Sequence, residues 1–358
     1  MFLKSDIVFL NIAILAILLA LSNYEYYELI IAGSTEIIDL YPITSQLIGG
    51  DSYLYYHSSF FEYVPIIYEG LLSGGVSVGS ILSLIGISLI NDLVKFIFGN
   101  YLYIGWVLFN ILVLLLSYLN IRKIIKSWNY SFFPSLIISP ILFYLITQPN
   151  KEIIALFLLS TLYKIIKSGY SIYDSFNLPF AAIFRDAYLV IILIYPFLKK
   201  INFFYIFLLL PVLIGLSLPD SYFENVAIEK MQASYKYTTL AKELMQTVIL
   251  SPLAVVIKFF MASFAQLRPS ILLEIIPDLK ITRLIFSYTA LILWIVPSFY
   301  FFRLREQITI PEMLFLKVLL VGVILFSFTQ GNPARYLLPF AVFYFLVVCE
   351  IRFLRLKI

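Results

Sequence analysis

The carboxylates and cations that interrupt the long apolar segments of this chain are its first candidates for chemistry. Asp51 follows a Gly-Gly turn and opens a tyrosine-rich segment that ends at His57, the only histidine. A carboxylate there can take the proton of a hydroxyl group, and the imidazole can act as a second base near neutral pH. The structural alternatives are that Asp51 caps a helix and that His57 is a hydrogen-bonded surface residue.

Two further pairs lie where apolar segments begin. Lys151 and Glu152 open one segment: a helix dipole favours the acid there, and the lysine can meet a lipid phosphate. Arg335 and Tyr336 open the last segment, directly after a turn that contains Asn332. An arginine inside a membrane costs roughly 2.5–3.5 kcal/mol and usually faces a cavity and a partner. Its planar fork suits phosphate, although snorkelling to headgroups is the alternative.

Two other arginines have structural interpretations of equal or greater weight. Arg185 and Asp186 lie at the centre of the apolar stretch 178–197, where we expect a self-satisfied ion pair that stabilises a broken helical hairpin. Arg268 belongs to an amphipathic stretch, Pro252 to Pro269, expected on the outer surface, where contact with lipid headgroups explains it at least as well as substrate binding does.

The composition places the chain among membrane proteins. Hydrophobic residues make up 62% of the sequence, charged residues only 13%, and the mean hydropathy is +0.97, whereas roughly a quarter of the residues in soluble domains are charged. We therefore expect an all-α, polytopic transmembrane bundle of about 8–11 spans, formed by residues 1–358 as one membrane domain. The expected spans are 6–22, 100–121, 131–148, 152–168, 203–218, 284–302, 312–330 and 335–351.

Short basic runs beside the segment ends orient this bundle, because Lys and Arg collect on the cytoplasmic side. They predict that the N-terminus, Arg122, Lys164, Arg303 and the C-terminal tail are all cytoplasmic. The net charge of +4 needs no nucleic-acid partner, since this topology accounts for the cations. The first segment is expected to be an uncleaved anchor, with cleavage after a signal-peptidase-like site as the alternative.

Two ambiguous stretches must then cross zero or two times. The first, 64–99, is interrupted by glycines and then by Asn91, Asp92 and Lys95, and we expect interfacial helices, with a true hairpin as the alternative. The second, 178–197, is expected to enter from the cytoplasm and return. The long loops, 23–99 and 219–283, consequently lie outside, and any substrate arrives there or in the membrane plane.

Several kinds of chemistry lack their motifs. The sequence contains neither a G-x-x-x-x-G-K-[ST] loop nor a G-x-G-x-x-G turn to cradle nucleotide phosphates. No G-x-S-x-G, H-E-x-x-H or paired Cys/His spacing supports hydrolase or zinc chemistry. No cofactor is implied with certainty, and a divalent metal remains an open alternative.

The first loop with its acid, the Lys151-Glu152 start and the Arg335-Tyr336 start together resemble the GT-C class of membrane glycosyltransferases. Within that class the short length and the lack of a soluble domain look most like bacterial O-antigen or capsule polymerases of the Wzy type. The resemblance implies that Asp51 is the base, with His57 and Glu152 as further catalytic candidates. It also implies that Arg335, with Lys151, Arg268, Tyr336 and Asn332, binds the carrier phosphate.

The implied function is polymerisation of polyprenyl-pyrophosphate-linked oligosaccharide repeat units, in lipopolysaccharide or capsule biosynthesis, at the periplasmic face of the bacterial inner membrane. Its expected partners are the lipid-linked glycan, membrane lipid, and chain-length regulator and flippase proteins, with no nucleic acid. Two alternatives stay open: a GT-C transferase that adds one sugar from a polyprenyl-phosphate donor, and a flippase or transporter of the lipid-linked oligosaccharide.

Overall fold

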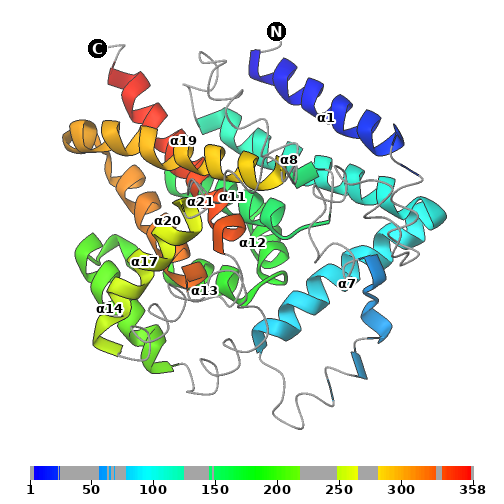
Figure 1. Cartoon of the computed structure of the whole chain (residues 1–358), viewed down its shortest axis with the longest axis horizontal. Coiled ribbons are helices and arrows are strands. Elements are labelled where there is room, and N and C mark those ends of the chain that lie inside the picture. The colour runs from blue at the N-terminus through cyan, green and yellow to red at the C-terminus, as the bar shows by residue number, and fades with distance from the viewer. Residues whose placement is uncertain are drawn as a thin grey trace.

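The computed structural model describes residues 4–22, 24, 56–62, 64–65, 68, 78–124, 145–146, 149–217, 248–264, 281–327 and 333–355, and all regular secondary structure within these ranges is helical (Figure 1). The long helices are α1 (Lys4–Ser22), α7 (Val78–Phe98), α8 (Leu102–Ile124), α11 (Glu152–Ser168), α14 (Phe203–Ser217), α17 (Ser251–Phe264), α19 (Ile281–Leu304), α20 (Ile310–Ser327) and α21 (Pro333–Arg355). Two short helices, α12 (Asp174–Ala182) and α13 (Asp186–Ile194), and the 3-10 turns η1 (Gly99–Tyr101), η2 (Phe197–Lys199), η3 (Val248–Leu250) and η5 (Arg305–Gln307) complete the described elements.

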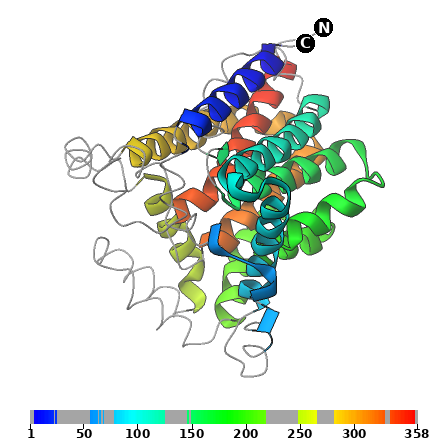
Figure 2. The ribbon, with the colours of Figure 1, turned by 90° about the vertical axis from the view of Figure 1, so that its right-hand side faces the viewer.

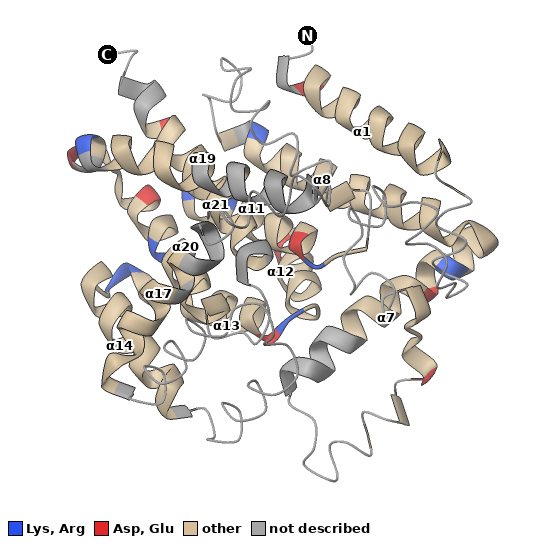
Figure 3. Ribbon diagram, viewed as in Figure 1, with Lys and Arg blue, Asp and Glu red and all other residues tan. Residues whose placement is uncertain are grey.

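These helices agree with the all-helical expectation and fall close to the predicted segments. Within the described residues, Ile85–Arg122 and Ile310–Ser327 are long and apolar enough to cross a membrane, and the first runs from α7 through η1 into α8. Four shorter apolar helices lie in α1, α14, α19 and α21. Charged residues are sparse along the described helices (Figure 3). The expected span 131–148 lies almost wholly outside the described residues.

Helix α11 is the centre of the bundle. It contacts α8, α12, α20 and α21, and every residue from 151 to 163 is buried. Asn150 caps its first turn by accepting a hydrogen bond from the Ile153 N–H at 3.0 Å. The helix ends at Gly169, whose φ of +86° is a left-handed conformation that favours glycine. A helix enclosed on all sides can hold polar groups away from solvent only where its neighbours supply partners.

Helices α1 and α8 form an antiparallel pair. Asp6, in the first turn of α1, pairs with Arg122 of the last turn of α8 at 3.2 Å and accepts a 2.5 Å hydrogen bond from the Tyr118 hydroxyl. The N- and C-termini lie at the same edge of the molecule in both views (Figures 1 and 2).

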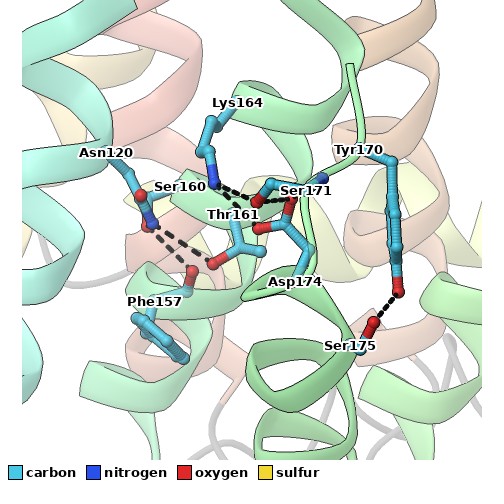
Figure 4. Close-up of polar contacts among 9 residues, drawn as sticks. All are labelled: Asn120, Phe157, Ser160, Thr161, Lys164, Tyr170, Ser171, Asp174 and Ser175. Atoms are coloured by element: carbon cyan, nitrogen blue, oxygen red, sulfur yellow. Dashed lines mark hydrogen bonds and ion pairs between the residues drawn. The ribbon is translucent and has the colours of Figure 1, made fainter. Parts of the chain in front are cut away.

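Two lysines of α11 hold the starts of two neighbouring helices. Lys164 pairs with Asp174 at 3.0 Å, and Asp174 also accepts hydrogen bonds from the Ser171 backbone N–H and hydroxyl, both at 2.8 Å (Figure 4). Lys167 likewise pairs with Glu312, which accepts a 2.8 Å hydrogen bond from the Thr309 N–H at the start of α20. Both acids follow the [ST]-x-x-[DE] pattern of a capping box, so each supports a helix start and an interhelical contact together.

The stretch 178–197 is broken, as expected. Helix α12 starts beside Lys164, near the end of α11, and the chain reaches the beginning of α11 by Tyr188, whose hydroxyl donates to the Lys151 carbonyl at 3.0 Å. The break lies between Ala182 and Asp186. After α13 the chain returns toward α20, where the Leu198 carbonyl accepts a 3.0 Å hydrogen bond from Lys317. Helices α12 and α13 are thus a hairpin whose tip, residues 183–185, lies near the start of α11.

Helix α7 differs from the expectation that polar residues interrupt it. It is continuous from Val78 to Phe98, and the break comes only at Gly99, which has a φ of +56°. Asn91 and Asp92 do not disturb the helix because their side chains bond the segment 56–62 instead of their own backbone.

Candidate functional site

Lys151 and Glu152 lie at the buried start of α11. Lys151 is 9% exposed and Glu152 only 1% exposed, so neither side chain lies on an open surface. The Lys151 carbonyl accepts both the Ala155 N–H at 3.2 Å and the Tyr188 hydroxyl at 3.0 Å. A carboxylate at the first position of a helix is favoured by the helix dipole, which offsets part of its burial.

Arg185, at the tip of the α12–α13 hairpin, brings a second cation to this end of α11. Its Nη1 atom is inaccessible to solvent and has no hydrogen-bond partner among the residues that the structure describes. The Glu152 carboxylate attracts the charge of Arg185. Tyr188 lies about one turn after Arg185, on α13. Arg185 as a whole is partly buried, and its buried Nη1 leaves one donor to spare, which suits an anionic ligand because a buried donor without a partner is costly.

Aromatic rings from two other helices form the floor beneath Arg185. Its Cζ atom lies 4.0 Å from the centroid of the Tyr336 ring on α21 and 5.2 Å from that of Phe326 on α20. The two rings are 6.0 Å apart, and Phe326 also lies 5.9 Å from Tyr188. Stacking on ring faces holds a guanidinium through cation–π attraction and leaves the N–H groups at its edge to donate.

The expected ion pair between Arg185 and Asp186 is wrong. Arg185 has extended backbone angles, with φ −166° and ψ 138°, whereas Asp186 begins α13. The two side chains therefore part: Arg185 reaches the aromatic floor, while Asp186 is exposed and accepts a 2.8 Å hydrogen bond from the Ala187 N–H. Adjacent residues in different backbone conformations rarely direct their side chains to one place.

The structure therefore brings together three of the predicted site residues: Lys151, Glu152 and Tyr336. Arg335 precedes Tyr336 in the first turn of α21, so its backbone lies beside the same cluster. The side chain of Arg335 is outside the described part of the structure, as are Asp51, Arg268 and Asn332. His57 is exposed, in the segment that Asn91 binds.

Arg185 is the site residue that the sequence analysis assigned to a structural role. The signal that could have singled it out is an arginine in the middle of an apolar segment, which usually marks a functional cavity. Because Asp186 follows directly in the sequence, Arg185 was instead interpreted as half of an ion pair.

The residues Lys151, Glu152, Arg185, Tyr188, Phe326 and Tyr336 are hereafter the α11 cluster. It combines the Arg185 cation, one carboxylate and aromatic faces, and Lys151 joins it through its backbone carbonyl. Cations and aromatic faces can bind a phosphate and a ring-shaped ligand, and the carboxylate can take or orient a proton. Within the described residues no three His, Cys, Asp or Glu side chains gather as a metal site.

Comparisons of this chain with known proteins gave no match. No protein-family model matches the chain, and neither the curated proteins nor the solved structures that were searched gave a match.

Proposed function

We propose that the protein is a multi-pass membrane glycosyltransferase of bacterial surface polysaccharide assembly, in the manner of a Wzy-type polymerase. It joins polyprenyl-pyrophosphate-linked oligosaccharide repeat units on the periplasmic face of the inner membrane. The observation that carries this proposal is the α11 cluster, in which the Arg185 cation lies near the buried Glu152 carboxylate within apolar helices.

The lengths of the helices support the multi-pass part of the proposal. Helices α8, α19 and α21 contain 23, 24 and 23 residues. At 1.5 Å per residue they measure roughly 34–36 Å, enough for a hydrocarbon core of about 30 Å. The basic residues at the end of α8 and near the end of α11 then lie on the cytoplasmic side, and the α11 cluster lies toward the periplasm.

The proposed chemistry needs only groups that this chain carries. The carrier pyrophosphate activates the anomeric carbon of the donor glycan. A base removes the proton of the incoming hydroxyl, and the candidates are Asp51, His57 and Glu152. Arg185, Lys151 and Arg335 stabilise the charge that develops on the departing phosphate, while Tyr336 supplies an aromatic face. Arg268 and Asn332 remain further candidates for phosphate contact.

One observation favours a second candidate, a flippase for the lipid-linked oligosaccharide. Transporters commonly bind substrate at discontinuous helices, and the break between α12 and α13 at Arg185 is of this kind. The enzyme proposal ranks first because a carboxylate lies in the same cluster as the cations. A transferase that adds one sugar from a polyprenyl-phosphate donor uses the same groups and differs only in its donor.

The surface polysaccharide of a strain that lacks the gene separates these candidates, with the gene restored on a plasmid as the control. A polymerase predicts that the electrophoretic ladder collapses to a single repeat unit and that the plasmid restores it. A retained ladder with shifted rungs indicates a transferase for one sugar. Complete loss of the polysaccharide indicates transport of the unit.

A further inference from the structure

Helix α7 contacts two parts of the proposed site that are far apart in the sequence. The first is the segment 56–62, which carries His57, and the second is the hairpin tip that carries Arg185. The positions on α7 that make these contacts, Gly86 and Asn91, are five residues apart, or about 7.5 Å along the helix axis.

Asn91 holds the backbone on both sides of His57. Its side-chain amide donates to the Tyr56 carbonyl at 3.0 Å and to the Ser58 carbonyl at 2.6 Å, and its oxygen accepts the Trp106 indole N–H at 2.8 Å. Asn91 is fully buried, so these bonds are made away from solvent. The exposed His57 side chain consequently projects from a backbone fixed at the residue before it and the residue after it.

The next residue of α7 extends this attachment. Asp92 accepts the Phe60 N–H at 2.8 Å and the Ser59 hydroxyl at 3.4 Å. The segment 56–62 is thus bound to α7 through side chains at two successive positions.

Gly86 holds the hairpin tip by close approach of two backbones. A Cβ atom built on Gly86 would lie 2.5 Å from the Ile183 carbonyl oxygen and 3.1 Å from the Phe184 Cα. These are backbone atoms of the two residues directly before Arg185, so a side chain on Gly86 would displace the tip. From the other side, Tyr188 fixes the tip to the Lys151 carbonyl.

We propose that α7 is a bracket that fixes the His57 segment and the Arg185 tip relative to each other, with Asn91 and Gly86 as positioning residues of the site. This inference rests on the proposed function, because it assumes that His57 and Arg185 serve one reaction. Neither Asn91 nor Gly86 needs to touch the substrate. Each acts on the backbone that carries a functional side chain.

The test measures position separately from product. Replacing the single cysteine with serine (Cys349→Ser) provides a background for two reporter cysteines at exposed positions. These are Phe61→Cys in the bound segment and Asp186→Cys, directly after the tip. The rate at which purified, detergent-solubilised protein reacts with a maleimide reports the exposure of each reporter.

Each positioning variant should change one reporter. Gly86→Ala should change the labelling rate at Asp186→Cys by roughly fivefold or more and leave Phe61→Cys within about twofold, since the overlap is confined to the tip. Asn91→Ala should show the reverse pattern. Leu89→Ala, on an exposed part of α7, is the matched control and should change neither rate.

Milder variants keep the test decisive if Gly86→Ala or Asn91→Ala fails to accumulate. Tyr188→Phe deletes one tip contact, and Trp106→Phe deletes one bond to Asn91 while leaving its bonds to the segment. Tyr188→Phe should raise the Asp186→Cys rate, and Trp106→Phe should raise the Phe61→Cys rate by less than Asn91→Ala does. A loss of stability throughout the protein would instead change both reporters together.

The polysaccharide ladder, made by the same positioning variants without reporter cysteines, supplies the second readout. The bracket predicts altered labelling and a shortened ladder for both Gly86→Ala and Asn91→Ala. Unaltered labelling in variants that accumulate overturns the bracket, whatever the ladder shows. Altered labelling with a normal ladder overturns the proposed function at this site, because misplacing its residues then has no consequence.

Discussion

At the scale of single residues, the α11 cluster depends on where one arginine lies. The Arg185 guanidinium lies over the Tyr336 and Phe326 rings and keeps a buried nitrogen without a hydrogen-bond partner among the described residues. Only a planar, permanently charged group can both lie over aromatic rings and keep a donor for a ligand. A lysine ammonium is not planar and does not present a fork of donors.

We therefore expect Arg185→Lys to lower polymer formation by about 10²-fold, a typical effect of losing one donor to a developing negative charge. The electrophoretic ladder of the complemented deletion strain measures it. Asp186→Asn is the matched control, because Asp186 is exposed and bonds only the Ala187 N–H among the contacts described. Normal polymer from Arg185→Lys would remove Arg185 from the proposed mechanism.

Glu152 allows a similar test of the carboxylate. Glu152→Gln keeps the volume and removes the charge and the basicity, so polymer formation should fall by about 10²–10⁴-fold if this group is the base. Protein levels in the membrane should remain near normal, because an amide is tolerated at the first position of a helix. An unchanged ladder would limit Glu152 to balancing the charge of Arg185.

At the scale of elements, the contact to test is the Lys164–Asp174 ion pair at the start of α12. Asp174 begins α12 in the turn after α11, outside the expected spans, and its side chain is inaccessible to solvent. Burial acts to raise the pKa of Asp174, but the hydrogen bonds from Ser171 and Lys164 outweigh burial and lower the pKa below its ordinary value. The folded state is consequently most stable when the Asp174 carboxyl group is ionised.

Because that pKa is lowered, the stabilisation is present at pH values above about 4 and is lost as the pH falls through the folded-state pKa. Asp174→Asn should lower the stability at neutral pH by about 1.5–3 kcal/mol, the usual contribution of hydrogen bonds to a charged group. Melting of the detergent-solubilised protein between pH 3 and 7 measures this. The wild type should lose more stability than the variant below about pH 4.

Ser175→Ala supplies the control for that experiment. It removes the exposed hydrogen bond between Tyr170 and Ser175, the residue that follows Asp174 in α12 (Figure 4). The variant should differ from the wild type by no more than about 0.5 kcal/mol. An equal effect of both substitutions would contradict a specific role of the Lys164–Asp174 pair.

At the scale of the whole molecule, the prediction concerns sidedness. With Cys349 replaced, a cysteine at Tyr170, in the exposed turn after α11, should react with a membrane-impermeant maleimide only after spheroplasts are permeabilised. A cysteine at Phe61 should react in intact spheroplasts. Reaction of both cysteines from one side would contradict the topology on which the periplasmic site depends.

The positions of most long helices follow from the sequence alone, although the continuity of α7 does not. Helix α11 spans 152–168 as expected, because an apolar run of that length begins at a capped acid and stops at a glycine that can adopt positive φ. The starts of α14, α20 and α21 likewise fall within two residues of the predicted segments. Apolar length and end signals are local properties, so no tertiary contact is needed to find them.

The sequence also singled out candidate site residues, through the rarity of polar groups in apolar segments, and Lys151, Glu152 and Tyr336 were among them. Only the tertiary structure decided that they meet at Arg185, and that Arg185 turns away from its neighbour Asp186 toward rings about 150 residues further along the chain. The physical reason is that a side-chain partner depends on backbone direction and on which helices pack together. A single sequence specifies neither, whereas the extended conformation of Arg185 and the packing of α13 beside α20 specify both.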